Sequence, residues 1–114
     1  LLGACRQQLD KSKLLFSQNY SPNQTDFWIP ESNLGIEAVF DWHSGKEFEL
    51  TRVLGDTAYR LEARALAVVT PNDMPEHQFQ AIKKIEEGGA FENLSVIRLH
   101  ALEDYLEDII ARTR

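Results

Sequence analysis

The chain has little cysteine and lacks long apolar runs, and both facts narrow its class. Cys5 is the single cysteine of the 114 residues, so no disulfide can form within the chain. The apolar runs are a few residues long, far short of the roughly twenty that a bilayer span needs. We therefore expect a soluble cytoplasmic protein that does not associate with membranes.

A signal peptide is also missing, because no basic segment is followed by a long apolar stretch at the start of the chain. The sequence begins Leu1-Leu2-Gly3, without a methionine. We therefore expect it to be a piece of a longer protein that contributes other domains.

Positive charge is scarce as well. Twelve Lys and Arg residues face 18 Asp and Glu residues, which gives a net charge of −6. This balance argues against a protein that holds nucleic acid through a broad positive surface, so any such contact must be local. The three histidines, His43, His77 and His100, are scattered without zinc-site spacing, and no nucleotide-binding or serine-hydrolase motif occurs.

What remains is an ordinary globular composition, with 43% hydrophobic and 26% charged residues. The length predicts one domain, residues 1–114, that buries about two-thirds of its unfolded surface. Helical spacing of apolar residues predicts helices over residues 2–18 and 46–63, from Pro75 to the Gly88-Gly89 stop, and from 102 onward. Runs typical of strands occupy residues 25–29, 34–42, 65–70 and 94–99. The order α-β-β-α-β-α-β-α predicts an α/β fold, a mixed sheet flanked by helices.

Two carboxylates are predicted to meet in the early hairpin. If its turn is Glu31-Ser32, Asp26 lies directly opposite Glu37. Both acids then lie on one face of the hairpin, the acidic face, and the other face is apolar. Opposed like charges destabilise a strand pair unless a proton or a cation lies between them. A divalent metal ion is the natural cation, and Mg²⁺ prefers carboxylate oxygens together with water and phosphate. The pair therefore indicates half of a site for phosphodiester hydrolysis.

The stretch Thr25–Asp41, TDFWIPESNLGIEAVFD, resembles the core of the PD-(D/E)XK nuclease superfamily, which has the restriction-endonuclease-like fold. The resemblance implies that Asp26 and Glu37 are the catalytic metal-binding acids and that the backbone carbonyl of Ala38 is a further ligand. It also implies a Mg²⁺- or Mn²⁺-dependent DNA endonuclease of the restriction-endonuclease-like or resolvase-like kind. DNA would then be the partner, and a homodimer is a second expectation, because many nucleases of this type pair to cut two strands.

One position departs from the family pattern. Val39 stands where the family usually has a lysine that orients the attacking water, and valine cannot do that work. Lys46, at the start of the next helix, is the nearest catalytic substitute, and Asp41 is a candidate third acid. The alternative is a catalytically inactive nuclease-fold module that binds nucleic acid or another protein within a larger chain.

The helix over 46–63 carries a second candidate surface. Arg52, Asp56 and Arg60 recur every four residues on its polar side, which predicts either a solvated ladder of ion pairs or, with Tyr59, a stripe that contacts nucleic-acid phosphates. Trp28 and Trp42 flank the acidic face of the hairpin. They are expected to pack against the sheet, and stacking on a base is the alternative.

Overall fold

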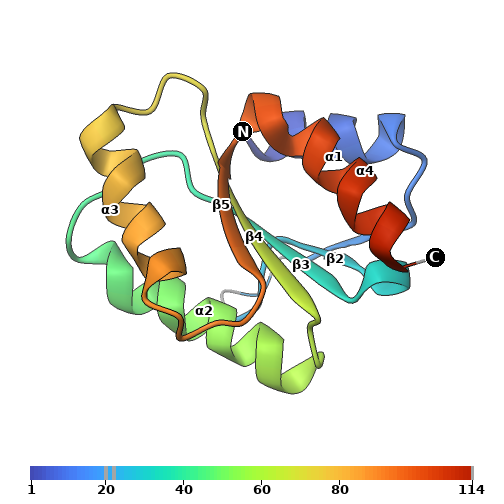
Figure 1. Ribbon diagram of the computed structural model, residues 1–114, viewed down its shortest axis with the longest axis horizontal. Helices are drawn as coiled ribbons and strands as arrows, with labels where there is room; N and C mark the ends of the chain where they lie inside the picture. Colours follow the sequence, from blue (N-terminus) through green and yellow to red (C-terminus); the bar gives the residue numbers. More distant parts are fainter. Residues whose placement is uncertain (20, 22, 114) are drawn as a thin grey trace.

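A five-stranded mixed sheet organises the chain (Figure 1). The computed structural model describes residues 1–19, 21 and 23–113. The strands follow one another across the sheet in chain order: β1 (Ser17–Gln18), β2 (Phe27–Ile29), β3 (Leu34–Ala38), β4 (Ala65–Thr70) and β5 (Leu94–Arg98). The first three strands pair antiparallel, and β3, β4 and β5 pair parallel.

Helices cover both faces of this sheet (Figure 1). They are α1 (Leu2–Lys11), α2 (Lys46–Arg60), α3 (Glu76–Glu87) and α4 (Leu102–Thr113), with short 3-10 turns at η1 (Pro30–Ser32) and η2 (Leu99–Ala101). Residues of α1 and α4 share one apolar cluster with the sheet, and residues of α2 and α3 share another. The predicted α/β class with a mixed sheet flanked by helices is therefore confirmed.

The hairpin register is confirmed. Phe27 pairs with Ile36, Trp28 with Gly35 and Ile29 with Leu34. The turn is the 3-10 turn η1, closed by the left-handed residue Asn33 at φ 47°. The side chains of Phe27, Ile29, Leu34 and Ile36 are fully buried against α1 and α4, so the apolar face is the one that the alternation predicts.

The first predicted helix is longer than the observed one. The predicted order α-β-β-α-β-α-β-α also lacks one strand, the edge strand β1. The helix ends at Lys11 instead of residue 18, because Lys13 adopts the left-handed conformation at φ 57° and turns the chain. Phe16 then packs edge-on against Phe27, with ring centroids 5.8 Å apart, and the edge strand β1 follows. Helical spacing of Phe16 was therefore accidental.

Other boundaries shift by smaller amounts. The second predicted strand, 34–42, ends at Ala38, because the chain leaves the sheet there and turns toward α2. The helix predicted to reach residue 63 ends at Arg60, and the left-handed Glu62 follows it at φ 52°. The first strand starts at Phe27 rather than 25 and the last ends at Arg98 rather than 99. The buried run 65–70 is strand β4, as predicted, with every residue buried.

None of the helices in the described part of the chain has the length and apolar character that crossing a bilayer requires.

Gly35 allows α2 to approach the hairpin closely. A β-carbon at this position would lie 2.9 Å from Oγ1 of Thr25 and 2.9 Å from Cγ2 of Thr57, a residue of α2. The buried amide of Thr25 donates a hydrogen bond to Oγ1 of Thr57 at 2.9 Å. This contact fixes the backbone directly before Asp26 against α2, so the small residue in β3 helps to position the first predicted acid.

Gly35→Ala is expected to lower the free energy of unfolding by about 1–3 kcal/mol, because the new methyl group overpacks the contact between β3 and α2. Gly55→Ala is the matched control. Gly55 lies inside α2, where a β-carbon would have only an ordinary contact at 3.9 Å, so alanine should raise the free energy of unfolding by about 0.5–1 kcal/mol. Urea unfolding of both variants tests this pair, and equal effects of the two substitutions would contradict it.

Candidate active site

Asp26 and Glu37 are tied to each other's strands by two crossed hydrogen bonds. The backbone amide of Asp26 donates to Oε1 of Glu37 at 3.0 Å, and the amide of Ala38 donates to Oδ2 of Asp26 at 2.8 Å. The pairing of Phe27 with Ile36 continues to this pair as the next opposed residues. The structure therefore brings the two predicted acids together at the open end of the hairpin.

Burial and the neighbouring Asp26 change the protonation of Glu37. The pKa of Glu37 rises from 4.5 to about 8. Burial is the largest cause, followed by the charge of Asp26 and a hydrogen bond between the two carboxyl groups. At neutral pH most molecules therefore keep a proton on Glu37 beside the carboxyl group of Asp26.

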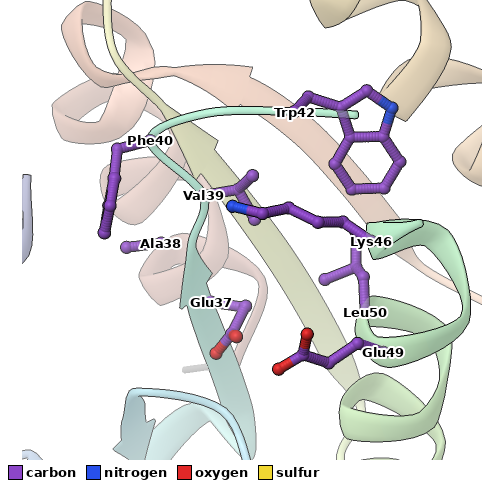
Figure 2. A pocket seen from close by; sticks show the side chains of 8 residues that line it. All are labelled: Glu37, Ala38, Val39, Phe40, Trp42, Lys46, Glu49 and Leu50. Carbon is purple, nitrogen blue, oxygen red and sulfur yellow. The ribbon is translucent and has the colours of Figure 1, made fainter. Parts of the chain in front are cut away.

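Glu37 opens onto a pocket of about 140 Å³ between β3 and the start of α2 (Figure 2). The lining residues are Glu37, Ala38, Val39, Phe40, Trp42, Lys46, Glu49 and Leu50. Figure 2 shows the carboxylates of Glu37 and Glu49 pointing toward each other, with the Lys46 side chain extended from α2 toward the strand. The pocket therefore combines one acid from the sheet, Glu37, with an acid and a cation from the helix.

Lys46 is already paired. Its ammonium forms an ion pair with the exposed carboxylate of Asp41, and the hydrogen bond and charge of Lys46 lower the pKa of Asp41. The same Nζ lies 5.9 Å from the centroid of the Phe40 ring. Asp41 follows β3 and belongs to this ion pair, so the structure does not bring it into the Asp26–Glu37 pair.

Val39 has a packing role. Its side chain is only 9% exposed and belongs to the apolar cluster under α2 and α3, which includes Leu50, Leu54 and Val68. Its backbone amide donates to the carbonyl of Val69 at 2.9 Å. Val39, which stands where the resemblance leads us to expect a lysine, is thus part of the core of this protein.

The predicted phosphate stripe does not reach the pocket. Arg52 donates a hydrogen bond from Nη1 to Oδ1 of Asn23 at 2.8 Å. Tyr59 and Arg60 are exposed in the last turn of α2. With a rise of about 1.5 Å per residue, Arg60 lies about 20 Å along the helix from Lys46. Tyr59 and Arg60 therefore lie far from the acids, whereas Arg52 lies one helical turn beyond the pocket residue Glu49.

Glu49 is the pocket residue that the sequence analysis missed. It follows Lys46 by three residues and precedes Val53 by four, so helical spacing places all three on one side of α2. The charge of Glu49 contributes to the raised pKa of Glu37. The spacing was visible in the sequence, but only the packing of α2 against β3 makes it relevant to Glu37.

Side chains alone supply only part of the ligands that a divalent cation needs at this site. Within residues 1–19, 21 and 23–113, no group of three or more His, Cys, Asp or Glu side chains is arranged to hold a metal ion. Mg²⁺ is commonly bound through one or two carboxylates and keeps several waters, so Asp26, Glu37 and the carbonyl of Ala38 are a chemically suitable set. A cation bound between Asp26 and Glu37 would relieve the repulsion that favours the protonated form of Glu37.

Comparison with protein-family models, with curated proteins and with solved structures finds no match to this chain.

Glu37→Gln is expected to make stability less dependent on pH. A carboxyl group whose pKa is raised on folding stabilises the fold below pH 4.5, and this stabilisation is lost as the pH rises to about 8. The variant lacks this loss, so its stability relative to the natural protein should rise between pH 5 and 8 by more than about 1 kcal/mol.

Urea unfolding at several pH values measures this difference. Glu31→Gln, which removes an exposed carboxylate from the hairpin turn, is the control for loss of a charge. The free energies of unfolding of Glu37→Gln and of the natural protein should therefore not differ by a constant amount from pH 5 to 8. A constant difference would contradict a raised pKa at Glu37.

Proposed function

We propose that this domain is a metal-dependent nuclease that hydrolyses DNA phosphodiester bonds, with a restriction-endonuclease-like fold. The observation that carries the proposal is the Asp26–Glu37 pair, which crossed hydrogen bonds hold together beside a pocket lined by Glu37 and Lys46. A structural hairpin gains nothing from two opposed carboxylates, since their repulsion destabilises the strand pair. The order hairpin, α2, β4, α3, β5, α4 supports the same fold family.

Asp26 and Glu37 would hold Mg²⁺ or Mn²⁺ together with the carbonyl oxygen of Ala38. Such an ion, when bound, polarises the phosphodiester and lowers the pKa of water. Glu37 must release its proton to become a ligand, so its pKa of about 8 makes this step easier as the pH rises. Lys46 would turn from Asp41 toward the phosphate, where its charge offsets the negative charge that develops during hydrolysis.

A catalytically inactive module that binds nucleic acid or a protein is the second candidate, and a specific observation favours it. Val39 is committed to the apolar cluster, and Lys46 is held by Asp41 in the absence of substrate. A domain of this kind would keep the fold and its binding surfaces and lack the group that orients water. The two candidates differ in whether DNA is cut.

The purified domain is expected to cut DNA in the presence of Mg²⁺ or Mn²⁺, and not in excess EDTA. Duplex, single-stranded and branched DNA are the substrates, because the sequence does not favour one of them. Glu37→Ala removes a predicted metal ligand and should abolish cutting. Glu31→Ala is the matched control, since it removes a carboxylate from the same hairpin but outside the pocket. Cutting that persists in Glu37→Ala, or no cutting of any substrate, would overturn the nuclease proposal.

Lys46→Ala is expected to reduce kcat at least about tenfold while leaving stability nearly unchanged, because its partner Asp41 is exposed. Lys11→Ala is the matched control, since Lys11 is an exposed lysine that pairs with Glu103 on the opposite face of the sheet. Steady-state cleavage rates and urea unfolding separate the two effects. Equal rates for Lys46→Ala and Lys11→Ala would contradict a catalytic role of Lys46.

A further inference from the structure

One of the large apolar side chains that the fold leaves in solvent, Phe40, lines the pocket. Within the described residues, the large hydrophobic side chains that are exposed are Leu15 at 72%, Phe40 at 63%, Phe48 at 78% and Tyr59 at 86%. Phe40 lines the pocket, and Phe48 lies in the first turn of α2. Figure 2 shows Phe40 beyond the ammonium end of the Lys46 side chain and Trp42 near the point where that side chain leaves α2. Aromatic surface is therefore available beside the acids.

Trp42 also lines a second cavity, of about 390 Å³, between the start of α2 and α3. The other lining residues are His43, Ser44, Glu47, His77, Gln78, Ala81 and Lys84. Because one side chain borders both cavities, they adjoin at Trp42. We call the two cavities together the Trp42 recess. It extends from Glu37, past the aromatic rings, to the polar residues of α3.

The charge of the recess is unsuited to a rigid duplex. Its lysines are Lys46 and Lys84, the acids Glu37, Glu47 and Glu49 also line it, and the chain as a whole carries a net charge of −6. Affinity for duplex DNA comes largely from neutralising many phosphates, which these residues cannot do. A single strand is bound by cations along its backbone together with stacking of its bases on aromatic rings, and stacking requires a base whose faces are not already stacked.

We propose that the Trp42 recess binds a single-stranded segment of DNA, with unpaired bases stacked on Phe40 and Trp42 and with the backbone passing Lys46 and Lys84. This inference rests on the proposed nuclease function and specifies its substrate class. A strand in this position runs past Glu37, so the phosphodiester beside the stacked bases is the one presented to the acids. Stacking selects unpaired DNA, and the lysines contact its phosphates.

Binding is tested apart from cleavage by fluorescence anisotropy in EDTA, with a labelled oligothymidylate and with a duplex of the same length. The single strand should bind more tightly than the duplex. Phe40→Ala should weaken its binding at least about fivefold, because one stacked base is lost. Trp42→Leu should do the same, and leucine keeps an apolar side chain against the neighbouring cluster. Leu15→Ala, an equally exposed apolar residue elsewhere, should change nothing.

Several outcomes would overturn the inference. These are equal affinity for the two probes, unchanged binding in both Phe40→Ala and Trp42→Leu, and a loss confined to Tyr59→Ala, which would place the surface on the far end of α2. Self-association that disappears in Phe40→Ala, without oligonucleotide binding, would identify the surface as an interface between copies of the chain.

The two proposals can fail separately. Single-strand binding that depends on Phe40 and Trp42, without metal-dependent cutting, supports the recess and overturns the nuclease. Cutting that requires Glu37 but is equally fast on duplex and single strand, and unaffected by Phe40→Ala, supports the nuclease and overturns the recess.

Discussion

The pairing of β2 with β3 is the constraint on which the site depends. A slip of one residue would turn the buried side chains of Phe27 and Ile36 to the opposite face of the sheet. Burying one such side chain stabilises the fold by about 1.5–3 kcal/mol, so the apolar face holds the register firmly. The same register forces Asp26 and Glu37 together. The core therefore stabilises a like-charge contact that the two acids would not form by themselves.

The proton held by Glu37 follows from this constraint. The crossed hydrogen bonds hold Asp26 and Glu37 together in the hairpin. Burial and then the charge of Asp26 disfavour the ionised form of Glu37, so the pKa of Glu37 is raised. Whatever cation binds here competes with that proton. The chemistry of the site thus originates in the packing of the opposite face of the sheet.

Local sequence patterns predicted the elements whose own residues show a clear periodicity or a clear end. The hairpin register followed from the alternation around the turn, and β4 followed from an apolar run with a proline behind it. The end of α1 did not follow, because Phe16 fits the helical spacing and nothing in the sequence requires the left-handed conformation of Lys13. Glu49 was missed for a different reason. Its role depends on which face of α2 meets β3, and that is a tertiary contact.

At this site, Val39 after β3 supplies apolar packing and Lys46 at the start of α2 supplies the positive charge. A side chain at residue 39 lies under α2, where the apolar cluster favours valine over a charged group. Lys46 enters the same pocket from the solvent side, so its stem can lie along the pocket wall while its charge remains hydrated. Its pair with the exposed Asp41 can be exchanged for a phosphate at little cost, since an exposed ion pair is weak. Cationic function at this pocket is therefore compatible with a buried valine, because the sheet supplies the packing and α2 supplies the charge.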